Sequence, residues 1–126
     1  MSIFSRTLGA TPALSSAAAT MRELNPRHLV GAEHGRQVFI EDHADADGRM
    51  YRLEYQCDGG GQNAQAYCRY NPWGGNPYTA IKSHLFEDGR ICLGDRAYSL
   101  QVAVLRARYW CTGYSYLREH GKFPDG

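Results

Sequence analysis

The chain has 126 residues, of which 43% are apolar and 21% are charged, and this composition is typical of a globular domain. We expect one domain over residues 1–126, with residues 1–10 flexible. The formal charge is +1, and no stretch gathers enough basic residues for a nucleic-acid footprint. No apolar run is long enough to cross a membrane, and the N-terminus lacks a signal-peptide pattern. The sequence therefore predicts a cytoplasmic protein that binds neither nucleic acid nor a membrane.

The first predicted element is a helix near the N-terminus. Thr11 is a suitable N-cap with Pro12 at the first helical position, and apolar residues then recur at three- and four-residue spacing as far as Leu24. Asn25-Pro26 ends this pattern.

A run of strands follows. Residues 37–41, 49–57 and 64–70 contain strand-type sequence, and apolar and polar residues alternate most cleanly over 49–57. The segments between them are rich in turn residues, which predicts a three-stranded antiparallel meander. Residues 71–77 hold two prolines and two glycines and cannot continue a ladder, so a fourth strand is expected at 78–83.

The last predicted element is a long amphipathic helix. Ser99 is a suitable N-cap, and apolar residues from Leu100 to Leu117 follow helical spacing, whereas three arginines point elsewhere: Arg106, Arg108 and Arg118. Gly113 is expected to break the helix, because glycine is a poor helix former. The order of elements gives the α+β class with an antiparallel sheet.

The four cysteines show neither a CxxC pair nor a zinc-ligand spacing. Because the sequence shows no signal-peptide pattern, we expect a reducing compartment, in which disulfides are rare. We therefore expect no metal, no cofactor and no disulfide framework. Cys57 and Cys68 fall at apolar positions of predicted strands, which favours a place in the core. Cys92 differs, because it follows a Glu-Asp-Gly turn in an irregular segment, where catalytic side chains often lie. Composition alone would still favour core packing for this thiol.

The stretch Gly89-Arg90-Ile91-Cys92-Leu93 resembles the active site of ubiquitin-conjugating enzymes, whose cysteine lies in a Gly-x-Ile-Cys-Leu sequence between a four-stranded meander and a helix. Upstream, Tyr70-Asn71-Pro72 and Asn76-Pro77-Tyr78 are similar to the family's proline-rich crossing. Downstream, Tyr98-Ser99-Leu100 resembles the start of the next helix. The resemblance implies an N-terminal helix, a four-stranded antiparallel meander, an active-site loop and a long C-terminal helix.

The resemblance also implies site residues. Cys92 would be the nucleophile that carries a ubiquitin-like modifier as a thioester. His84 stands where the family usually has an asparagine, and its ring N–H would serve as an oxyanion donor or would structure the loop. Gly94 replaces a frequent acidic residue, and Asp95, one place further on, would orient or deprotonate an amine unless it is simply a solvated loop acid.

The chain ends nine residues after Leu117, and in this it resembles the short bacterial members of the family found in antiphage defence operons. The partners implied are a ubiquitin-like modifier protein, an activating enzyme and a protein substrate such as a nucleotidyltransferase or a phage protein. No cofactor is implied, since the thioester arrives already activated.

Other interpretations compete with this one. A protein of the same fold can act as a non-catalytic adaptor or scaffold, in which case Cys92 is incidental. A cysteine hydrolase would need a base within reach of Cys92, and His84 alone offers thin support. The residues from His43 to Glu54 imitate a calcium loop, but histidine is a poor first ligand and a strand follows, so a hairpin turn is favoured. Residues 58–62 lack the ending of a phosphate loop.

Overall fold

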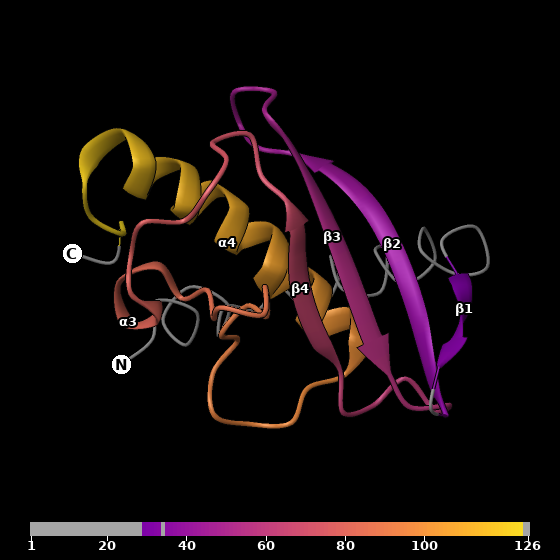
Figure 1. The fold of residues 1–126 in the computed structure, drawn as a ribbon. Helices are drawn as coiled ribbons and strands as arrows, with labels where there is room; N and C mark the ends of the chain where they lie inside the picture. The colour runs from indigo at the N-terminus through magenta and orange to yellow at the C-terminus, as the bar shows by residue number, and fades with distance from the viewer. Residues whose placement is uncertain (1–28, 34, 125–126) are drawn as a thin grey trace.

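A computed structural model describes residues 29–33 and 35–124 of the chain. In this part of the chain four strands precede two helices (Figure 1): β1 Leu29–Glu33, β2 Arg36–Ala44, β3 Met50–Cys57, β4 Gln65–Tyr70, α3 Ala80–Ser83 and α4 Leu100–His120. The α+β class is confirmed. The helix predicted between residues 11 and 24 lies outside the described residues. Within the described part, neither helix is long and apolar enough to cross a bilayer.

The sheet is antiparallel throughout, with the strands in the order β1-β2-β3-β4. The strands predicted at 37–41, 49–57 and 64–70 are confirmed as β2, β3 and β4. Along β3, Tyr51, Leu53 and Tyr55 are fully buried while Arg52 is exposed. This alternation arises because one face of the sheet is covered by α4 and successive side chains of a strand point to opposite faces.

Two expectations about the strands are wrong. Residues 78–83 do not form the fourth strand: Thr79 accepts a hydrogen bond from the Lys82 amide at 3.3 Å and caps the short helix α3 instead. The fourth strand of the sheet is β1, which the sequence analysis missed. Gly35, directly before β2, has a φ of 78°, a left-handed conformation that favours glycine.

Helix α4 crosses one face of the sheet and contacts β3 and β4 (Figure 1). Ser99 is the N-cap, as predicted, and its hydroxyl accepts a hydrogen bond from the Val102 amide at 3.3 Å. The helix does not break at Gly113. A Cβ atom at that position would lie 2.3 Å from Cε1 of Phe123, so glycine is required there by the close approach of a ring. The central residue of the core is Trp110, which is fully buried and stacks on Tyr114 at a centroid distance of 4.9 Å.

Two buried polar clusters join the sheet to α4. In the first, Glu41 of β2 receives hydrogen bonds from the Tyr55 hydroxyl at 2.5 Å and from Nε of Arg108 at 3.0 Å. Removing one partner of such a pair would leave a buried charge without compensation.

The second cluster is centred on Asp45, in the turn after β2. Its carboxylate accepts hydrogen bonds from the Ser115 hydroxyl at 2.6 Å and from the backbone amides of Asp47 and Arg49, each at 2.9 Å. Burial raises the pKa of Asp45, but these hydrogen bonds outweigh it and the pKa falls below the ordinary value of 3.8. The turn between β2 and β3 is therefore a hairpin held by its own carboxylate, as predicted in place of a calcium loop.

Candidate functional site

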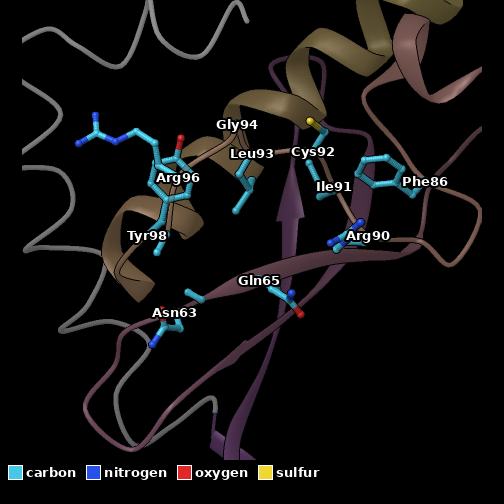
Figure 2. Close-up of a pocket in the computed structure, with 12 residues that line it drawn as sticks. Asn63, Gln65, Phe86, Arg90, Ile91, Cys92, Leu93, Gly94, Arg96 and Tyr98 are labelled. Carbon is cyan, nitrogen blue, oxygen red and sulfur yellow. The ribbon is translucent and has the colours of Figure 1, made fainter.

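Cys92 lies in the irregular segment between α3 and α4. It is the one partly exposed cysteine of the four, because Cys57, Cys68 and Cys111 are all buried. It lines a pocket of about 360 Å³. Figure 2 shows Cys92 at one end of this pocket, with Asn63, which precedes β4, and Gln65, the first residue of β4, at the other. A thiol in this position can meet a reagent or a partner that enters the pocket.

Backbone hydrogen bonds attach the segment before Cys92 to the outer edge of β4. The Cys68 amide donates to the Gly89 carbonyl at 2.7 Å, and the Ile91 amide donates to the Ala66 carbonyl at 2.8 Å. Isolated bridges pair Tyr67 with Arg90 and Leu85 with Ile91. The chain leading to Cys92 is thus held like a short additional strand, so the cysteine sits on a rigid part of the fold.

Helix α4 fixes both sides of the same loop. The indole Nε1 of Trp110 donates to the Ser83 carbonyl at 2.8 Å, and Nη1 of Arg106 donates to the Leu93 carbonyl at 3.0 Å. Residues four apart on a helix lie on one face, so these two side chains reach carbonyls that bracket Cys92.

The expectation that Arg106 points away from the apolar face is wrong: its residue exposure is only 9%, and its guanidinium lies 4.6 Å from the centre of the Tyr98 ring. A signal for this existed in the sequence. Arg106 is three residues from Ala103 and four from Trp110, so it occupies the same stripe as residues that are fully buried. Arg106 thus contacts the loop that carries Cys92 and is a positioning residue beneath it.

His84 is placed beside Cys92 by its backbone. It ends α3 in the left-handed conformation, with a φ of 57°, and its carbonyl accepts a hydrogen bond from the Cys92 amide at 2.8 Å. Its ring packs edge-on against Phe123, with the two centroids 4.8 Å apart. The structure therefore gives His84 a part in shaping the loop, and a role for its ring as an oxyanion donor stays a prediction.

The two positions after Leu93 have different surroundings. Gly94 has a φ of 131°, and a Cβ atom there would lie 2.3 Å from the Tyr98 hydroxyl, so this position requires glycine. Asp95 is exposed and is not among the residues that line the pocket. Its proposed action on an incoming amine stays a prediction.

The remaining thiols are protected by burial. Burial raises the pKa of Cys57, raises that of Cys68 to about 12, and holds that of Cys111 well above its ordinary value. Because the thiolate is the reactive form, these three side chains are poor nucleophiles at neutral pH. The described residues contain no group of three or more histidine, cysteine, aspartate or glutamate side chains that could hold a metal ion.

The site as a whole can support nucleophilic chemistry at sulfur. It brings together a reachable thiol, a loop fixed from two directions, and a pocket with polar and apolar walls. Comparison with known proteins found no matching family model, no matching curated protein and no matching solved structure. An assignment of function to this chain therefore stands on the resemblance of its sequence motif and on the geometry around Cys92.

Proposed function

We propose that the protein is a ubiquitin-conjugating-type enzyme that accepts a ubiquitin-like modifier as a thioester on Cys92 and transfers it to an amine of a target protein. The observation that carries the proposal is the contrast among the four thiols: Cys92 is partly exposed in a pocket, while the other three are buried. The sequence around it, Gly-Arg-Ile-Cys-Leu, supplies the link to this class of enzyme.

The reaction has two acyl transfers. The Cys92 thiolate attacks the carbonyl of a thioester on the activating enzyme; the new S–C bond forms, the old one breaks, and the activating enzyme recovers its thiolate. A substrate amine then attacks the Cys92 thioester, loses a proton to solvent or to a nearby base, and forms an amide while Cys92 leaves as a thiolate. His84 is the candidate donor to the oxyanion and Asp95 the candidate group for the amine.

The fixed backbone around Cys92 supports this mechanism. Acyl transfer is favoured by a nucleophile and donors that are already in position before the substrate arrives. The carbonyl contacts of Arg106 and Trp110 hold the loop without occupying the thiol. The proposal places the protein in the cytoplasm of a bacterium, in antiphage defence, with a modifier, an activating enzyme and a target protein such as a nucleotidyltransferase or a phage protein as its partners.

The test is intact mass spectrometry after incubation with ATP, a candidate activating enzyme and its modifier, with and without a thiol reductant. We expect a mass increase equal to the modifier that reductant removes and that Cys92→Ala abolishes. Cys92→Ser is the matched control, because an oxygen nucleophile would form an ester that reductant does not remove.

If activating enzymes that charge their own conjugating partners leave this protein unmodified, the non-catalytic adaptor becomes the better account. A reductant-sensitive adduct on Cys92→Ala would contradict the assignment of Cys92.

A further inference from the structure

The arginines of the described segments fall into two groups. Seven of the nine donate side-chain hydrogen bonds to carboxylates or carbonyls: Arg36, Arg49, Arg52, Arg69, Arg106, Arg108 and Arg118. Within the same segments, the guanidinium groups of Arg90 and Arg96 have neither kind of partner. Both of these residues line the Cys92 pocket.

Arg90 is the better prepared of the two to receive a ligand. Its Nε atom is shielded from solvent and has no hydrogen-bond partner in the described part of the chain, as is also true of Nε in Arg36 and Arg106, so the Nη atoms of Arg90 are the ones that a ligand can reach. Its guanidinium lies 4.5 Å from the centre of the Phe86 ring, which restricts the orientation of the group. A carboxylate that enters the pocket could accept hydrogen bonds from the two Nη atoms of this planar group.

The charge of the pocket favours the same kind of ligand. Among the described residues, its lining includes Arg90, Arg96 and the amides of Asn63 and Gln65, and neither aspartate nor glutamate. In Figure 2, Arg90 lies near Gln65, whereas Arg96 stands on the opposite side with its guanidinium directed outward. Arg90 is therefore placed to contact a group inside the pocket, and Arg96 a group at its rim.

We propose that the Cys92 pocket selects a modifier with an acidic residue in its C-terminal tail, with Arg90 as the principal contact and Arg96 as a secondary one. This inference rests on the proposed function, because a tail whose terminal carboxyl is bonded to Sγ of Cys92 would extend along the pocket that Cys92 lines. A carboxylate a few residues before the terminus gains an ion pair with Arg90. A lysine or arginine at the same place meets like charge and is disfavoured.

The experiment uses synthetic peptide thioesters, which acylate a cysteine without an activating enzyme. Each peptide ends in Gly-Gly and carries Glu, Gln or Lys at the third, fourth or fifth residue from the carboxyl end. Initial rates of acylation of the full chain are measured by intact mass, and Cys92→Ala gives the background. We expect the Glu peptide to react about tenfold faster than the Lys peptide at one or more of these positions, as a partly shielded pair of charges would give.

Variants assign the preference to individual residues. Arg90→Gln should reduce the ratio to less than about twofold, Arg96→Gln should reduce it partly, and Arg90→Glu should reverse it. Arg52→Gln is the matched control: it removes the same charge from β3, where Arg52 pairs with Asp42, and it should leave the ratio unchanged. Added salt should weaken the preference, as it does for charges near a surface.

Different results would overturn the acidic-tail proposal and the assignment to Arg90. Equal rates for all peptides, with acylation confined to Cys92, would overturn the acidic-tail proposal and leave the proposed function standing. A preference that survives in Arg90→Gln would overturn the assignment to Arg90.

If none of the peptides acylates Cys92, the assay with the activating enzyme decides the proposed function. In that case, binding of a fluorescent acidic peptide to Cys92→Ala decides the pocket's role. Binding that Arg90→Gln weakens would keep an acidic-peptide site, and the absence of binding would overturn it.

Discussion

Replacing Gly113 by alanine provides a quantitative test of the packing under the site. In the interior of an exposed helix this change would stabilise the protein by about 1 kcal/mol, because alanine is the better helix former. Here the new Cβ would lie 2.3 Å from Cε1 and 2.8 Å from Cζ of Phe123. The ring is only 7% exposed, and displacing it into water would cost about 2–3 kcal/mol. The two effects together predict a net loss of about 1–2 kcal/mol.

The reasoning is tested with a double-mutant cycle of Gly113→Ala and Phe123→Ala, measured by urea unfolding monitored through helical circular dichroism. In the wild-type background Gly113→Ala should destabilise the protein. In the Phe123→Ala background the clash is gone, so the same change should stabilise it by about 1 kcal/mol. If Gly113→Ala has the same sign in both backgrounds, the approach of the ring is not what requires glycine. Phe123→Leu serves in the cycle if the alanine variant fails to fold.

Three further outcomes are expected. Arg106→Gln should lower the free energy of unfolding by about 2 kcal/mol, since the Leu93 carbonyl loses a charged donor, and it should slow acylation of Cys92; unchanged values in urea unfolding and peptide-thioester assays would contradict its positioning role. The lowered pKa of Asp45 means that the unfolded chain takes up its proton first as pH falls, so this carboxylate stabilises the fold above about pH 5 and its contribution is lost at lower pH. Unfolding measured from pH 6 to 3 should therefore show a shallower pH dependence in Asp45→Asn than in the wild-type chain, and an equal dependence would contradict this. A thiol reagent should modify one cysteine of the native chain, Cys92, and all four after unfolding; peptide mapping that finds Cys57 or Cys68 modified first would oppose the burial argument.

Much of the fold could be predicted because single-sided burial leaves a periodic trace in the sequence. The inner residues of β3 alternate with outer ones, and the stripe of α4 recurs at helical spacing, since each element buries one face against the other. Ser99 could be predicted as a cap because its hydroxyl acts on an amide only three residues away.

The failures arose where local pattern and burial disagree. Tyr78 and Ile81 have strand-type side chains, but Ile81 is 91% exposed and none of the described strands pairs with this segment, so the cap at Thr79 decides the local structure. In β1, Gly31 weakens the strand pattern, and a register shift in its pairing with β2 lies beside that residue.

Only part of the candidate site was within reach of sequence reasoning. Cys92 could be identified by its sequence motif. It lies in an irregular segment, where apolar residues follow no helical or strand spacing that could have identified it. The contacts of Arg106 and Trp110 with the loop depend on the way α4 crosses the sheet, which is a property of the packed structure. The lack of a hydrogen-bond partner for the Arg90 guanidinium among the described residues likewise depends on the packed structure, because no sequence pattern shows which arginines are paired.

The segment that carries Cys92 also has a consequence for solubility. An edge strand with free amides and carbonyls is a template for association with another chain, and the amide of Cys68 and the carbonyl of Ala66 would be such groups on β4. Both are occupied by the segment from Gly89 to Ile91. A substitution that loosens this segment would therefore release a strand edge as well as a thiol, and its first symptom in the laboratory would be aggregation.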